Sequence, residues 1–144
     1  MIKSTITKLG FLFLVAISFT ACDKYEEGAN YSLLTAKMRI VNHWKLDKVT
    51  ITNGNTSYDA TNLYPNTIMK VKKDNTYETI YTAGNITTNE TGAWDFNDDK
   101  TQVIITETGE NPDSYNIIKL KNKELKVEYV DGNTTYTYEY SEDE

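Results

Sequence analysis

The sequence predicts an all-β fold, an eight-stranded, up-and-down antiparallel barrel preceded by one short N-terminal helix. Tyr, Thr, Val and Ile, which suit a pleated and half-buried surface, are abundant, and the chain has only two prolines. Eight short segments alternate apolar and polar residues with a period of two, and Asn, Asp and Gly separate them. A two-sheet sandwich is the alternative architecture, although closure into a barrel removes the exposed strand edges.

The chain begins with the parts of a secretory signal peptide. Lys3 and Lys8 precede an apolar run from Leu9 to Phe19, and two small residues follow it. This run is about half of the roughly 20 residues that a membrane-spanning helix needs, so we predict a cleaved signal over residues 1–21.

The stretch Phe19-Thr20-Ala21-Cys22 resembles the lipobox of bacterial lipoproteins, with Phe19 where Leu is usual. In those proteins the cysteine is acylated, with chains such as palmitate, and becomes the mature N-terminus. The resemblance implies a lipid anchor on Cys22 and an outer-membrane lipoprotein that faces the periplasm or the cell surface. Cys22 is the only cysteine, so its acylation would exclude disulfides, zinc–thiolate sites and cysteine nucleophiles.

The predicted organisation is a signal peptide over 1–21, a lipidated linker over 22–30 and one barrel domain over 31–144. Cleavage leaves 144 − 21 = 123 residues, enough for a single core. The 15 basic and 21 acidic residues become 13 and 21 because the signal holds two lysines and no acid, which gives a net charge of 13 − 21 = −8. An acidic chain without a basic cluster argues against binding to nucleic acid or, by charge alone, to anionic lipid.

The linker that follows Cys22 is polar and has two interpretations. It is either a solvated tether or a loose version of the acidic export signal that sends lipoproteins of the Bacteroidota to the cell surface, since Glu26 and Glu27 follow closely.

Residues Tyr31 to Asn42 form the predicted helix, with Asn30 or Ser32 as its cap. The apolar residues at helical spacing are Leu33, Leu34, Met38 and Val41. A short amphipathic helix in this position usually covers an open barrel end or a sheet edge.

The first strand starts at His43, and its inward positions change parity along its length. Trp44 and Leu46 share one parity and Val49 and Ile51 the other, so we predict a bulge near residues 47–48. Asn53 to Asn66 is predicted as a long polar loop, Ala83 to Asn89 as a connection, and Ser141 to Glu144 as an acidic tail. The inward residues predicted for the later strands are Met69 and Val71; Tyr77, Thr79 and Tyr81; Trp94 and Phe96; Val103 and Ile105; Tyr115 and Ile117; Leu125, Val127 and Tyr129; and Tyr136, Tyr138 and Tyr140.

The order of short motifs resembles the lipocalin-like domains of Bacteroidota lipoproteins over about residues 40–140. Those domains typically read G-x-W-x-L, F-x-x-D-G-T-Y, G-x-W-x-F and I-x-x-L-x-x-x-x-L. The counterparts here are Trp44-Lys45-Leu46, residues 71–77, Gly92-Ala93-Trp94-Asp95-Phe96, residues 117–120 and residues 125–127. Asn42-His43 replaces the first glycine region, Val71 the Phe and Asn75 the turn glycine. The resemblance implies a barrel with room for an interior cavity, but no particular ligand.

Three groups of residues are candidates for chemistry, and each has a simpler interpretation. His43 is the only histidine and has no partner for a triad or a zinc site at short spacing. Asp95, Asn97 and Asp99 resemble the start of a calcium loop, but Lys100 stands at the glycine position and the pattern also fits a hairpin turn. We predict no catalytic residue, no metal site and no cofactor.

Acidic residues also flank Pro112, and they are the third group. Glu107, Glu110 and Asp113 could supply the paired carboxylates of a glycosidase, but nothing in the sequence indicates a surrounding cleft. A solvated loop is the simpler interpretation.

The eleven tyrosines are the strongest candidates for a binding site. Their simplest role is to fill the interior, because an eight-stranded barrel holds at most one small ligand. Alternatively they line a pocket, in which case the predicted ligand-binding residues are Tyr77, Tyr81, Tyr136 and Tyr138, or they form an external surface for glycan or protein contact. Trp44, Trp94 and Phe96 are predicted core residues.

The functional prediction is a lipid-anchored protein that binds a small apolar or amphipathic ligand in the barrel mouth without catalysis. The alternative is a protein- or glycan-interaction module, such as a hydrolase inhibitor or a surface-complex accessory, that uses loops or the outer sheet. A cavity of a few hundred Å³ favours the first function. A filled barrel with an exposed aromatic patch favours the second.

Overall fold

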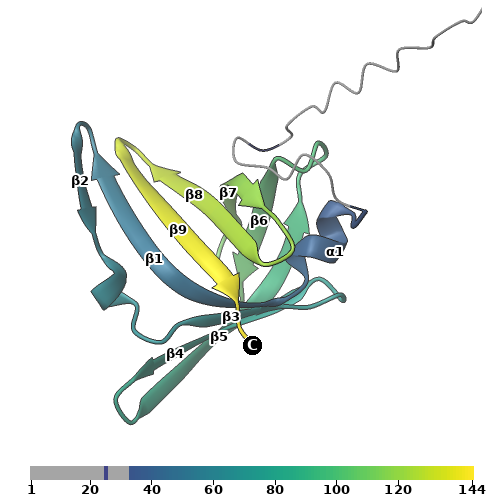
Figure 1. The fold of residues 1–144 in the computed structure, drawn as a ribbon, viewed down its shortest axis with the longest axis horizontal. Coiled ribbons are helices and arrows are strands. Elements are labelled where there is room, and N and C mark those ends of the chain that lie inside the picture. The colour runs from purple at the N-terminus through teal and green to yellow at the C-terminus, as the bar shows by residue number, and fades with distance from the viewer. Residues whose placement is uncertain (1–24, 26–32) are drawn as a thin grey trace, which may run out of the picture.

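The computed structural model describes Tyr25 and residues 33–144. The predicted signal peptide, Cys22 and most of the linker lie outside the described residues. Eight strands form a closed antiparallel barrel in which the last strand pairs with the first, so the prediction of a barrel is confirmed over a sandwich (Figure 1). The barrel strands are β1 (His43–Asn53), β3 (Ile68–Val71), β4 (Thr76–Ala83), β5 (Ile86–Phe96), β6 (Gln102–Glu107), β7 (Asp113–Leu120), β8 (Glu124–Asp131) and β9 (Thr134–Glu142). A ninth, short strand, β2 (Thr56–Asp59), pairs with β1 and lies outside the closed ring.

The segment Asn53–Asn66, predicted as a loop, contains the extra strand β2 and the 3₁₀ helix η1 (Thr61–Leu63). Strand β1 pairs with β3 only over residues 43–45, so the same edge of its second half needs another partner. Strand β2 folds back on that edge and pairs with residues 50–53. The polar sequence thus protects a free strand edge, which composition alone does not indicate.

The boundaries of β5 and β9 also differ from the prediction, because strand pairing extends both strands into segments that were predicted to be irregular. The connection predicted over Ala83–Asn89 shrinks to a tight turn at Gly84, because β5 starts at Ile86 and pairs with β4 along its whole first half. The predicted acidic tail continues β9 as far as Glu142, which pairs with Trp44.

The bulge predicted in the first strand is confirmed. The register between β1 and β9 shifts between Leu46 and Lys48, and this shift puts Trp44, Leu46, Val49 and Ile51 all in the interior. The extra residue allows two stretches of opposite parity to face the same core.

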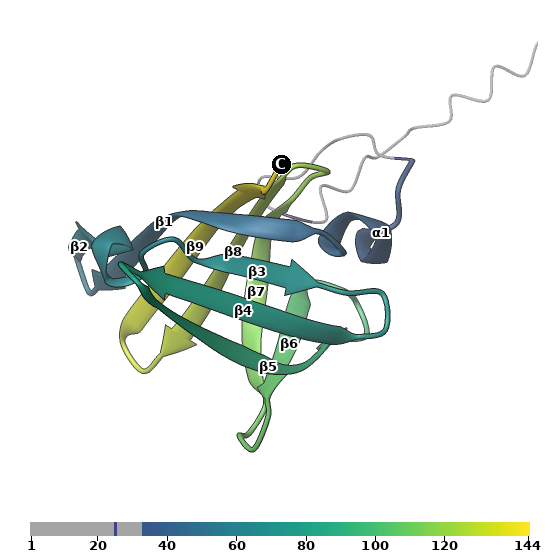
Figure 2. The ribbon, with the colours of Figure 1, turned by 90° about the horizontal axis from the view of Figure 1, so that it is seen from below.

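The helix α1 (Ala36–Ile40) covers one end of the barrel, as predicted (Figure 2). It is shorter than the predicted Tyr31–Asn42. The hydroxyl of Thr35 accepts a hydrogen bond from the backbone N–H of Met38, so Thr35 caps the helix. The predicted cap residues, Asn30 and Ser32, lie outside the described residues. No helix among the described residues is long and apolar enough to cross a membrane.

The end under α1, which we call the closed end, is tightly packed. Trp44 is 0% and Trp94 is 2% exposed, and Phe96 packs edge-on against Trp94. The indole N–H of Trp44 donates to the carbonyl of Ile40 (2.8 Å), and that of Trp94 donates to the carbonyl of Lys72 (3.0 Å). The three residues predicted as core therefore pack together at this end.

Tyr25 joins the same core although it lies in the predicted linker. Its side chain is 3% exposed, and its hydroxyl donates to the carbonyl of Lys100 (3.1 Å). The guanidinium of Arg39 lies over its ring, 5.8 Å from the centroid. At this residue the linker is a packed element and not a solvated tether.

Candidate functional site

The barrel holds a cavity of about 520 Å³ that opens at the end opposite α1, which we call the mouth. Ile40 of α1, Val71 of β3 and Trp94 of β5 line its deep part, and Leu125 and Val127 continue the apolar wall on β8. This volume lies within the 300–1,000 Å³ range of small-molecule sites. The expectation that the tyrosines simply fill the interior is therefore wrong.

Tyrosines form much of the wall between the deep part and the mouth. Three of the four predicted ligand-binding residues line the cavity: Tyr77 and Tyr81 on β4 and Tyr138 on β9. Tyr136 is not a lining residue. It packs against Tyr129 (ring centroids 6.1 Å apart) and against the small cluster formed by Leu46, Val49, Ile51 and Ala60.

Contacts between the rings explain how tyrosines leave space instead of filling it. Tyr138 meets Tyr64 edge-on (6.1 Å) and also contacts Tyr115 (6.3 Å), which in turn packs on Tyr129 (5.3 Å). These four rings therefore support one another along the wall and not across the barrel axis.

Five of the cavity's phenol groups have a raised pKa and are neutral over the physiological pH range. Burial first, and then the charges of Glu107 and Glu90, raise the pKa of Tyr77 to about 12. Burial also raises the pKa of Tyr115 to about 12, with Asp113 as the next cause. Burial likewise raises the pKa of Tyr81, Tyr138 and Tyr140. The wall thus offers uncharged hydroxyl groups that can donate or accept hydrogen bonds.

Four carboxylates line the cavity: Glu90, Glu107, Glu110 and Asp113. All four are exposed, so the predicted solvated position of the last three is compatible with the structure. However, these carboxylates line the cavity, whereas the simpler interpretation of the sequence was a solvated loop.

Of the lining residues, Glu90 and Tyr64 were not predicted as site residues, and Glu107 and Asp113 were considered only as possible catalytic carboxylates of a solvated loop. Strand parity could have located the three carboxylates. Glu90 shares the parity of Trp94 on β5, and Glu107 shares that of Val103 and Ile105 on β6. Asp113 has the same relation to Tyr115 on β7. Tyr64 follows η1, outside any regular strand, and carries no such signal.

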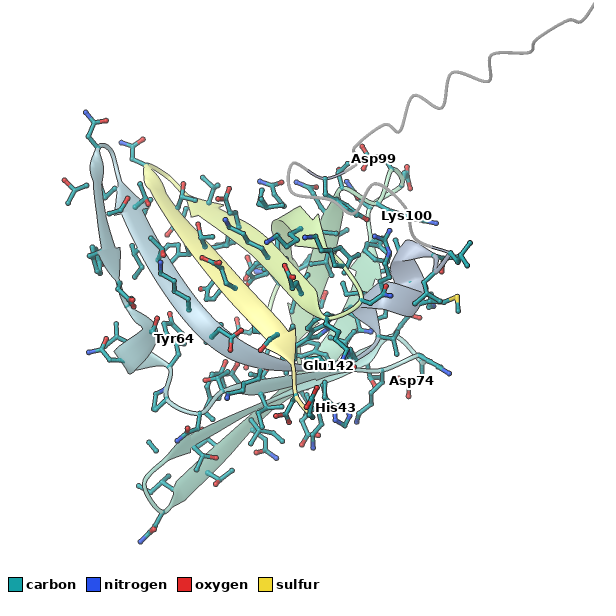
Figure 3. The ribbon with its side chains drawn as sticks, viewed as in Figure 1. His43, Tyr64, Asp74, Asp99, Lys100 and Glu142 are labelled. Atoms are coloured by element: carbon teal, nitrogen blue, oxygen red, sulfur yellow. The ribbon has the colours of Figure 1, made fainter. Side chains whose placement is uncertain are left out.

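The other candidate residues lie away from the cavity, around the closed end (Figure 3). His43 is exposed at the start of β1. The backbone N–H groups of Phe96, Gln102 and Thr101 donate to the side chains of Asp95, Asn97 and Asp99, respectively, around the turn between β5 and β6. These hydrogen bonds give the three residues a structural role in the turn.

Comparison with known proteins identifies one family. The model of the lipocalin-like domain matches residues 40–127, which are 88 of the 144 residues and run from the end of α1 into β8. No curated protein sequence matches the chain significantly.

Proposed function

The chain belongs to the lipocalin-like domain family, whose members are typically non-catalytic binding proteins, and from this premise we propose that it binds one small apolar or amphipathic molecule in its barrel mouth. The observation that carries the proposal is the cavity of about 520 Å³, apolar at depth and tyrosine-lined above. Apolar surface gives such a site most of its affinity, and a few polar groups fix the orientation of the ligand.

Binding without covalent chemistry fits the composition of the wall. Among the described residues that line the cavity there is no Ser, Cys, His or Lys, and the remaining candidate nucleophiles and bases, the four carboxylates, are all exposed to solvent. The phenols of Tyr77 and Tyr115, with pKa values of about 12, are poor nucleophiles at neutral pH.

We also propose that the protein is anchored in the outer membrane through acylated Cys22, on its periplasmic or outer face. Three peptide units separate Cys22 from Tyr25 and reach at most about 11 Å. Because Tyr25 packs at the closed end, beside α1 and the β5–β6 turn, this short tether would hold the closed end close to the bilayer. The mouth would then face the aqueous compartment.

The anchor is tested by metabolic labelling with palmitate. The wild-type protein should incorporate label and fractionate with membranes, whereas Cys22→Ser should lose both properties. For orientation, a fluorophore at Asn133→Cys on the β8–β9 turn should resist quenching by labelled lipid headgroups more than one at Asp98→Cys in the β5–β6 turn. Equal quenching would contradict the proposed orientation.

Ligand binding is tested by native mass spectrometry of residues 23–144, purified without detergent from a complex lysate. This chain retains every described strand and helix and the buried Tyr25. We expect a bound mass that is lost on denaturation, and its identity would give the ligand class. Absence of any bound mass, together with no binding of the probes described below, would overturn the proposal in favour of an interaction module.

A further inference from the structure

The cavity is strongly asymmetric in charge. Of its 22 lining residues, four are carboxylates and none is Lys, Arg or His. The carboxylates come from adjacent parts of the barrel: β5, the end of β6, the β6–β7 loop and the start of β7. They therefore form one acidic side of the opening, which we call the acidic rim: Glu90, Glu107, Glu110 and Asp113.

No ion pair among the described residues neutralises the acidic rim. The ion pairs given for the described part of the chain join Lys70 to Glu78, Lys119 and Lys121 to Glu124, and Lys123 to Glu142 and Glu144. Within the rim, Glu90 accepts a hydrogen bond from the hydroxyl of Tyr81 (2.8 Å), which leaves its negative charge in place. The pKa of Tyr77 rises partly because Glu107 and Glu90 lie near its hydroxyl, so the field of these carboxylates reaches the cavity wall.

Ligands of different charge would experience this site differently. An anionic head group would lose hydration and meet four like charges without a cation to pair with. A cationic head group would meet carboxylates without basic partners and the tyrosines of the wall. Carboxylates and the faces of aromatic rings both attract positive charge. In either case the apolar tail could occupy the deep part between Ile40, Val71 and Leu125.

From this arrangement we infer that the barrel selects amphipathic molecules with a positively charged amine or quaternary ammonium group, held at the acidic rim with the apolar body inside. The inference rests on the proposed function, because it assigns a charge class to the ligand of that same cavity.

The test uses three probes with the same tail: decyltrimethylammonium, decanol and decanoate. The two ionic probes are kept below their critical micelle concentrations, and decanol is kept below its solubility limit. Binding to residues 23–144 is measured by titration calorimetry at pH 7.5, in low salt and in about 0.5 M salt. We expect the ammonium probe to bind at least about tenfold more tightly than decanoate, with decanol between them. Salt should narrow this gap because it screens exposed charges.

The outcomes separate the two proposals. Equal affinities, or a preference for decanoate, would overturn the charge inference and leave the ligand-binding function in place. Failure of all three probes to bind would count against the ligand-binding function itself.

A charge-matched pair of variants assigns the effect to the acidic rim. Glu107→Gln with Glu110→Gln removes two exposed carboxylates for which the structure gives no side-chain hydrogen bond, so the fold should persist. This variant should weaken the ammonium probe about tenfold and leave decanol unchanged. The control, Asp98→Asn with Glu144→Gln, makes the same change of charge at the closed end. If both variants weaken the ammonium probe equally, overall charge and not the rim is responsible.

Discussion

The closed end and the mouth of the barrel are built from the same alternating strands, but they differ in their polar groups, which are buried and hydrogen-bonded at the closed end and partly exposed at the mouth. At the closed end, the polar atoms of Trp44, Trp94 and Tyr25 each donate to a backbone carbonyl, and the side chains are at most 3% exposed. At the mouth, half-buried tyrosines surround open space, and carboxylates lie without basic partners among the described residues. The difference indicates that the closed end supplies stability, whereas the mouth is suited to the proposed binding.

Removal of a closed-end anchor should have the largest effect. Trp44→Ala should lower the free energy of unfolding by about 3–5 kcal/mol, because it empties a fully buried site and leaves the Ile40 carbonyl without its indole donor. Urea unfolding measures this loss. Tyr58→Ala, on the exposed strand β2 beyond the mouth, should cost about 0.5 kcal/mol. Similar decreases in the free energy of unfolding in the two variants would contradict the proposal that the closed end contributes most of the stability.

Two glycines sharpen the comparison because they are required for different reasons. A Cβ on Gly92, in the barrel wall, would lie 2.1 Å from the carbonyl oxygen of Thr106 and 2.8 Å from the ring of Tyr77. Gly92→Ala should therefore cost about 3 kcal/mol, the upper end of the usual range for overpacking.

Gly84 is the matched case at a hairpin tip beyond the mouth. It has φ = +61°, and a Cβ there would have no atom within 4 Å. Gly84→Ala should cost only about 1 kcal/mol through backbone conformation, and Gly84→Asn less, because Asn tolerates positive φ. If Gly92→Ala is as stable as Gly84→Ala, the backbone at Thr106 and the ring of Tyr77 must be able to shift at little cost in free energy.

The fold was more predictable than the site, and the reason is geometric. Side-chain direction in a strand has a fixed period of two, so the barrel, the bulge before Lys48 and the inward tyrosines could all be predicted from spacing. Strand β2 could not be predicted, because it exists to pair a free edge of β1 that only the assembled barrel reveals.

The cavity could not be predicted from the sequence, for a related reason. Whether inward rings fill a barrel or line a space depends on contacts between residues far apart in the chain, such as Tyr64 with Tyr138 and Tyr115 with Tyr129. Glu107 was a candidate catalytic carboxylate, but without a known cavity its inward parity could not be connected to a binding site. Tyr25 was assigned to the linker because a single buried aromatic residue has no periodicity.

Alkaline pH should weaken the barrel through its buried phenols. The pKa of Tyr77 is about 12 in the folded chain and about 10 when unfolded, so above pH 10 the unfolded state loses a proton that the folded state keeps. This stabilising contribution is complete below pH 10 and is lost as the pH rises to 12, by up to about 1.4 kcal/mol per pH unit. Urea unfolding of Tyr77→Phe between pH 9 and 12 should show a correspondingly shallower decline. An unchanged slope would mean that Tyr77 does not retain its proton in the folded state.

A small effect on stability is expected at the mouth, where the hydroxyl of Tyr81 donates to the carboxylate of Glu90 (2.8 Å). Tyr81→Phe removes this hydrogen bond between partly solvated groups and should change the free energy of unfolding by less than about 1 kcal/mol. The ring and its contribution to the wall remain, so decanol should bind as to the wild type. The Glu90 carboxylate loses a donor, so its charge becomes more available and the ammonium probe should bind at least as tightly as before. Urea unfolding and calorimetry on the same preparation measure both quantities. A large loss of stability would mean that the Tyr81–Glu90 hydrogen bond stabilises the fold as the closed-end residues do, and it would contradict the proposed difference between the two ends.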